Sequence, residues 1–149
     1  MTASNPLDTL IDQSREARDN AGRVLAEERR GQQHSADQLR ALEQYRAEYR
    51  RQLQDAMHAG IDATSLDNYR RFIRSLDDAI DHARKALEQQ SARVNASRDQ
   101  LDQRQRRLAS YDTLASRRAR EARTRDARRE RRDNDEMTTH ALARRPRSG

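Results

Sequence analysis

Apolar residues recur every seven positions through the second half of the chain. Eight consecutive positions of this series are apolar: Leu66, Ile73, Ile80, Leu87, Val94, Leu101, Leu108 and Ala115. The positions interleaved between them are mixed, and include Tyr69, Leu76, Gln90, Ser97 and Arg104. A seven-residue repeat is the signature of a left-handed coiled coil, in which each apolar side chain packs into a partner helix. The pattern predicts one long helix over about residues 66–132.

A second helix is predicted over about residues 6–59, with a less regular pattern. Asn5 and Pro6 suit the N-cap and the first helical position. The apolar residues are Leu39, Leu42, Tyr49, Leu53 and Ala56 toward its end, and Leu7, Leu10, Ile11, Val24 and Leu25 toward its start. Glu28 and Gln32 fall on seam positions, and Gly22 and Gly31 each disfavour helix by about 1 kcal/mol relative to Ala. The first half of this helix is therefore expected to be the less stable part.

Residues 60–65 form the expected turn between the two helices. Gly60 suits the left-handed residue that closes a helix. Thr64, followed three residues later by Asp67, resembles a capping box that opens the next helix. The expected fold class is all-α, a long antiparallel two-helix coiled-coil hairpin over residues 1–149, with residue i roughly opposite residue 124 − i at helical spacing. Residues 133–149 are expected to form a tail.

The composition of the 149-residue chain agrees with an elongated helical protein. Hydrophobic residues make up 33% and charged residues 38%, whereas a globular domain has about 45–50% apolar residues. No apolar run approaches the ~18 residues of a membrane span, and the amino terminus lacks the layout of a signal peptide. The absence of Cys excludes disulfides and thiol chemistry and fits the cytoplasm.

The net charge of +6 resides in one stretch, residues 117–132, here called the basic segment. It carries nine Arg against three acids, Glu121, Asp126 and Glu130, and the rest of the chain is electrically balanced. The acids allow a single helix held by i,i+4 Arg–carboxylate pairs. Because the hairpin rule places Leu7 near Arg117, the basic segment is expected to extend past the open end of the hairpin.

The sequence contains no constellation that would support catalysis or bind a metal or cofactor. The four glycines are dispersed, so they cannot form a phosphate-binding loop. The four histidines are also isolated, without the grouping that zinc requires. We therefore expect neither enzymatic activity nor a bound cofactor.

Aromatic and apolar residues gather near the turn, on one face of each predicted helix. This aromatic strip comprises Gln38, Leu42, Tyr45, Tyr49, Phe72, Leu76 and Ala79. Exposed Tyr and Phe offer a large contact area at a low entropic cost, so the strip is a candidate for binding a protein partner. Packing of large side chains within the coiled coil would explain the same spacing.

Two stretches of the chain resemble the flagellar FliJ family. The first consists of Tyr45-Arg46-Ala47-Glu48-Tyr49-Arg50, Leu53, Met57-His58-Ala59-Gly60-Ile61, Asn68-Tyr69-Arg70-Arg71-Phe72-Ile73 and Leu76. The second consists of Asp135-Glu136-Met137 and Ala141-Leu142-Ala143-Arg144-Arg145-Pro146. The tyrosine and phenylalanine motifs of the first stretch are the more specific, because a heptad repeat does not require them.

The resemblance implies a non-enzymatic component of the flagellar type III export apparatus, at the cytoplasmic face of the inner membrane. Family members are similar to the rotor stalk of rotary ATP synthases and promote assembly of the export ATPase FliI into its ring. They also contact the export-gate protein FlhA and recycle export chaperones. The family's gate-binding positions fall on the aromatic strip. Ala83 stands where the family has a larger polar residue, so the strip is expected to end sooner in this chain.

The ATPase-binding end is expected to combine part of the basic segment with the first turns of the chain. Arginine suits this role because it tolerates partial desolvation better than lysine when it meets carboxylates. The residues concerned are Leu7, Leu10, Ile11, Arg117, Arg118, Arg120, Arg123, Arg125 and Arg128.

Two other functions are compatible with parts of the pattern. Nine Arg in the basic segment could bind nucleic acid, but the three acids, the absence of interleaved aromatic residues and the Gly60 turn argue against it, so no nucleic-acid partner is expected. A passive structural coiled coil, with hairpins associating into a four-helix bundle, is the second alternative.

Overall fold

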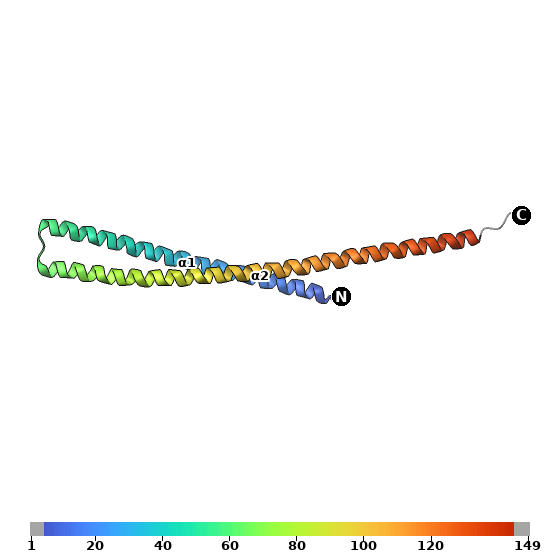
Figure 1. The fold of residues 1–149 in the computed structure, drawn as a ribbon, viewed down its shortest axis with the longest axis horizontal. Helices are drawn as coiled ribbons and strands as arrows, with labels where there is room; N and C mark the ends of the chain where they lie inside the picture. Colours follow the sequence, from blue (N-terminus) through green and yellow to red (C-terminus); the bar gives the residue numbers. More distant parts are fainter. Residues whose placement is uncertain (1–4, 145–149) are drawn as a thin grey trace. The chain divides into compact units, whose positions relative to one another are not determined.

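The chain folds into two long α-helices joined by a short turn (Figure 1). The computed structural model describes residues 5–144, and within this range it contains no β-strand. Helix α1 spans Pro6–Ala59 and helix α2 spans Ala63–Ala143. The two helices pack against each other, so the predicted all-α helical hairpin is confirmed.

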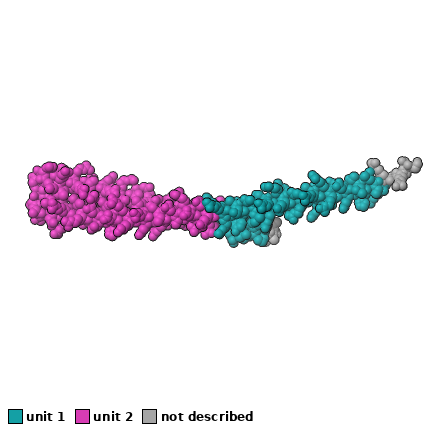
Figure 2. Space-filling model, viewed as in Figure 1, with its two compact units in different colours: residues 1–15, 105–149 teal, residues 16–104 magenta. Residues whose placement is uncertain are grey.

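Two compact units divide the chain, and both helices contribute to each (Figure 2). The first unit consists of residues 1–15 and 105–149, and the second of residues 16–104. The second unit therefore holds the turn together with most of α1 and the first half of α2. The first unit holds the start of α1 and the remainder of α2.

Helix α1 begins at Pro6 because a polar residue caps its first turn. The side-chain oxygen Oδ1 of Asn5 accepts a hydrogen bond from the backbone N–H of Leu7 at 3.2 Å, and its carbonyl accepts one from Thr9. Asn5 is thus the N-cap, and Pro6 occupies the first helical position, where no N–H is needed. The carboxylate of Asp8 lies in the first turn, where its negative charge interacts favourably with the positive end of the helix dipole.

The turn is shorter than expected and comprises residues 60–62. Gly60 adopts φ 84°, the left-handed conformation expected of it, and its N–H donates to the carbonyl of Met57. The N-cap of α2 is Asp62 rather than Thr64: its Oδ1 accepts a hydrogen bond from the N–H of Ser65 at 3.1 Å. Helix α2 consequently begins at Ala63, three residues before the expected start.

The side chains that join the helices are those of the heptad series. In the second unit, Leu76, Ile80 and Val94 of α2 and Leu25 of α1 are buried. All the remaining positions of the heptad series and of the positions interleaved with it, from Leu66 to Ala115, are at least partly buried. In the first unit, Leu7, Ile11 and Leu108 form a small cluster, against which Tyr111 and Ala115 pack. The predicted seam of α2 is therefore the core of the molecule.

Helix α2 continues further than the sequence indicated. It reaches Ala143 instead of ending near residue 132, so most of the expected tail is helical. Residues 116–144 are exposed to solvent except for the partly buried Ala122. The helix persists because residues 63–143 contain neither Gly nor Pro. The final part of the expected tail, residues 145–149, lies outside the described residues.

A polar layer interrupts the apolar seam in the second unit, and it consists of Glu28, Gly31, Gln32, Gln90 and Ser91. The amide Nε2 of Gln90 donates to the backbone carbonyl of Glu28 at 3.0 Å and to its carboxylate. The amide of Gln32 donates to Oγ of Ser91 at 3.1 Å. A Cβ on Gly31 would lie 3.0 Å from Nε2 of Gln90. A side chain at this position would therefore displace the end of the Gln90 side chain from the α1 backbone.

The two helical glycines are expected to respond differently to alanine. A Cβ on Gly22 meets nothing within 4 Å, so Gly22→Ala should raise the free energy of unfolding by about 1 kcal/mol through helix propensity. Gly31→Ala should give no such gain, because the displaced Gln90 amide loses a hydrogen bond worth about 1 kcal/mol. Urea denaturation followed by circular dichroism measures both, and equal stabilisation would contradict the role of the polar layer.

The cap at Asp62 should make the stability sensitive to acid. Hydrogen bonds from the side chain and backbone of Ser65 lower the pKa of Asp62 below its ordinary value of 3.8. A lowered carboxylate pKa contributes stability that is complete above the ordinary value and is lost as the pH falls through the folded value. Asp62→Asn keeps a capping oxygen but does not titrate there, so its melting temperature should fall less than that of the unsubstituted chain between about pH 5 and about pH 3. An equal fall would contradict the assignment.

Candidate protein-docking surfaces

Four aromatic rings meet near the turn, two from each helix. Tyr49 of α1 is the central ring: its centroid lies 4.2 Å from that of Phe72, 6.0 Å from that of Tyr69 and 5.8 Å from that of Tyr45. The Tyr45 and Phe72 rings are 6.5 Å apart. These separations fall within the range of favourable aromatic pairs. The two helices thus present a connected aromatic surface in the second unit.

Exposure differs among the predicted members of the aromatic strip. Tyr45 is 52% exposed, Phe72 is 38% exposed and Gln38 is also exposed. Leu42, Tyr49 and Ala79 are partly buried. Leu76 is only 7% exposed and belongs to the interhelical core. A partner can reach Tyr45 and Phe72 directly, whereas Leu76 supports the strip from beneath.

Charged pairs between the helices border the strip. Arg46 of α1 contacts Asp77 of α2, and Glu43 lies 3.6 Å from Arg84. Because these groups are substantially exposed, each pair adds little to stability. Their residue numbers agree with the expected antiparallel register near the turn.

Sequence reasoning did not include the hollow beside the strip. It has a volume of about 380 Å³ and is lined by Tyr49, Ser65, Asn68, Tyr69 and Phe72. Tyr69 belongs to the interleaved heptad positions and is partly buried, but its ring also lines this hollow. The early start of α2 places Ser65 on the helix. Asn68 lies within the helix that the sequence predicted.

The candidate ATPase-binding residues divide into an exposed and a buried group. The six arginines among these candidate residues are all exposed. Within residues 5–144, no ion pair joins the basic segment to a carboxylate. The i,i+4 pairs that the sequence allowed are therefore not formed. Leu7 and Ile11 are buried against Leu108, and only Leu10, at 41%, is exposed.

At this end, Leu7 and Ile11 pack in one cluster with Leu108, Tyr111 and Ala115. The sequence rule places Arg117 opposite Leu7, and Ala115 of the cluster is two residues from Arg117, so the cluster agrees with the expected register. The consequence is that the whole basic segment lies beyond the packed cluster of the first unit.

The described residues contain no group of three or more His, Asp or Glu side chains arranged to hold a metal ion. Among the same residues, no helix combines the length and the apolar character needed to cross a membrane. What the helices do present is side-chain surface of two kinds, aromatic in the second unit and cationic in the first.

The fold defines a two-helix coiled-coil protein with aromatic and cationic side chains on its surface. The chain belongs to the FliJ family: it matches the family described as Flagellar FliJ protein over residues 3–147. Membership places the chain in a family of flagellar proteins.

Two curated relatives carry the same description. The Flagellar FliJ proteins of Escherichia coli (strain K12) and of Salmonella typhi are each 39% identical to this chain over 89 residues. The match covers 60% of this chain and 60% of each relative's length. A solved structure described as a YscO homologue, CT670 of Chlamydia trachomatis, is similar with a TM-score of 0.45 and 20% identity, over 95% of this chain and 98% of that one. That likeness is too weak to carry an argument.

Replacing each of two tyrosines by alanine should show how much a packed ring and an exposed ring contribute to the free energy of unfolding. Tyr49→Ala removes the ring that contacts the other three aromatics and should lower the free energy of unfolding by about 2 kcal/mol. Tyr45→Ala removes a ring that is half in solvent and should cost less than about 1 kcal/mol. Urea denaturation of both variants measures the difference, and equal losses would show that the cluster is not centred on Tyr49.

Proposed function

We propose that this protein links three parts of the flagellar export apparatus: the export ATPase FliI, the export-gate protein FlhA and the export chaperones. The basic segment binds the ATPase ring and promotes its activity, and the aromatic strip binds the gate. The protein acts at the cytoplasmic face of the inner membrane, as a general chaperone or chaperone escort, without enzymatic activity or a cofactor. The observation that carries the proposal is the presence of two chemically different docking surfaces, one in each unit.

The basic segment supports the ATPase contact through its exposure and its free charge. Its guanidinium groups are not engaged by carboxylates of the described residues, so a partner's acidic groups do not have to displace existing pairs. Each planar guanidinium can form two parallel hydrogen bonds with one carboxylate. Helical order before binding lowers the entropic cost of association, since the backbone does not have to become ordered.

The aromatic strip supports the gate contact through exposed rings on a rigid base. Tyr45 and Phe72 project from a cluster whose central ring, Tyr49, is held between them. Exposed aromatic side chains with restricted rotamers are typical of the residues that dominate binding energy in protein interfaces. Buried Leu76 and Ile80 join the two helices beneath this surface.

One pair of variants tests both contacts together. Replacing Arg123, Arg125 and Arg128 by Glu should abolish stimulation of the cognate ATPase, because cations are replaced by groups that repel acidic partners, and should leave binding to the soluble portion of FlhA unchanged. Tyr45→Ala should do the reverse and weaken FlhA binding at least about tenfold, as loss of an interface aromatic does. ATP hydrolysis rates and isothermal titration calorimetry measure the two effects.

A matched control distinguishes the effect of the position of the arginines from the effect of the net charge. Arg29, Arg93 and Arg98 are exposed in the second unit and form no ion pair within the described residues. Their replacement by Glu changes the net charge equally and should leave ATPase stimulation intact. Loss of stimulation in both triple variants would show a general charge effect, and retention in both would remove the basic segment from the contact.

A further inference from the structure

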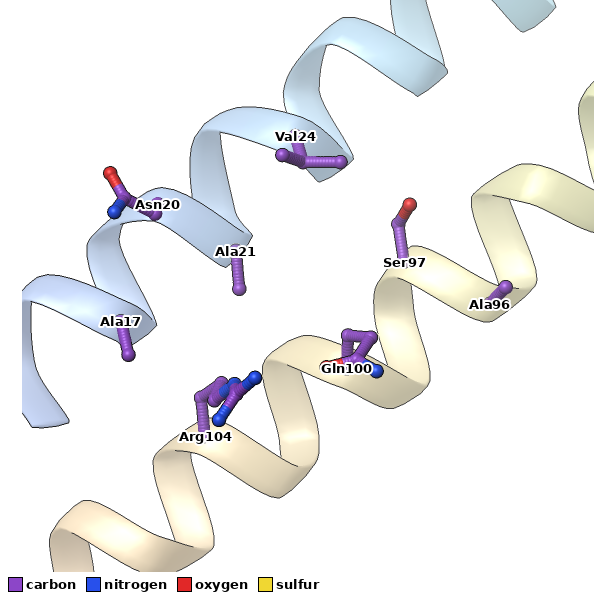
Figure 3. A pocket seen from close by; sticks show the side chains of 8 residues that line it. All are labelled: Ala17, Asn20, Ala21, Val24, Ala96, Ser97, Gln100 and Arg104. Atoms are coloured by element: carbon purple, nitrogen blue, oxygen red, sulfur yellow. The ribbon is translucent and has the colours of Figure 1, made fainter.

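A groove runs between the helices in the second unit, on the side of the polar layer away from the turn. It has a volume of about 420 Å³ and is lined by Ala17, Asn20, Ala21 and Val24 of α1 and by Ala96, Ser97, Gln100 and Arg104 of α2 (Figure 3). Seven of these eight side chains are uncharged, on a chain in which 38% of residues are charged. The groove is therefore chemically distinct from the surface around it.

The groove exists because the seam is underfilled here. Seam positions of α2 hold Ser97 and Arg104 in place of Leu or Ile, and α1 opposes them with Ala17 and Ala21. Small side chains cannot fill the space that coiled-coil packing assigns to a large apolar residue. Val24, one of the apolar residues of this helix, remains 47% exposed at the edge of this space.

Arg104 has no acidic partner within the described part of the chain. Its side chain is partly buried and extends into the groove alongside Ala17 and Ala21 (Figure 3). No hydrogen bond or ion pair joins its guanidinium to another described residue. A partly desolvated cation without a counter-charge is costly, and a carboxylate supplied from outside would offset that cost.

We propose that this groove binds an amphipathic α-helix of a protein partner, with an Asp or Glu of that helix paired to Arg104. The lining residues recur at three- and four-residue spacing over about two turns of each helix, which is the footprint of a third helix lying along a two-helix groove. Alanines at 17, 21 and 96 allow the close approach of its backbone. Its apolar side chains would cover Val24.

A second copy of this chain is the less suitable occupant. The apolar seam of each hairpin is already occupied by the opposite helix, as the burial of Leu25, Ile80 and Val94 shows. Apart from the aromatic strip near its turn, a second hairpin would therefore offer mostly charged faces to an uncharged groove. A partner helix with an exposed apolar face and a carboxylate would cover the exposed Val24 and form an ion pair with Arg104.

Photo-crosslinking in the flagellated bacterium tests the proposal. The full-length chain carries p-benzoylphenylalanine at Val24, and the crosslinked peptide is sequenced by mass spectrometry. The expected adduct is an amphipathic segment containing Asp or Glu. Arg104→Glu should lower its yield at least about fivefold, whereas Arg104→Lys should retain it within about twofold because a cation remains. The same amino acid at exposed Arg93 is the positional control.

A second variant keeps the test independent of misfolding. Ala21→Leu fills the groove from within, so it should raise the melting temperature of the hairpin and abolish the adduct. Reversal of the partner's acidic residue should restore the adduct with Arg104→Glu. An adduct formed equally at Arg93, an adduct with a second copy of the chain, or an adduct unaffected by Arg104→Glu or Ala21→Leu would overturn the proposal. ATPase stimulation measured on Arg104→Glu distinguishes failure here from failure of the basic segment.

Discussion

Two helices packed against each other have one contact surface, and this constraint governs the whole molecule. Each helix can bury only the face that meets its partner, so the remaining faces are in water and must carry polar or charged residues. The chain satisfies this with its single heptad seam, in which no more than a few side chains, such as Ile80 and Val94, are almost fully buried. Stability is consequently distributed along the seam, and side chains elsewhere are available for binding.

The composition of the seam divides it into parts with different roles. Near the turn it is apolar and aromatic, and it supports the exposed rings of Tyr45 and Phe72. Further along, Glu28 and Gln90 form a polar layer whose hydrogen bonds favour one pairing of the helices, as a buried polar residue does in other coiled coils. Arg104 then leaves the seam unfilled and open to a partner. Departures from an ideal repeat are thus where specificity and binding arise.

The two proposed contacts of the export apparatus use opposite physical means. The aromatic strip depends on rings held in place by tertiary packing, so its binding and its stability are linked through Tyr49. The basic segment depends on charge along a helix with almost no tertiary contact. Its order comes from helix propensity alone, since residues 63–143 contain neither Gly nor Pro.

The sequence alone determined the elements of this protein. The heptads, Asn5, Pro6 and Gly60 specify two helices and a turn, because caps and left-handed glycine act locally. It also indicated the basic segment and the aromatic strip, since charge and three- and four-residue spacing can be read directly. Tertiary structure decided which of these side chains are accessible. Leu76, Leu7 and Ile11 became core and Val24 stayed exposed, because burial depends on the residue opposite, and that residue lies dozens of positions away in the chain.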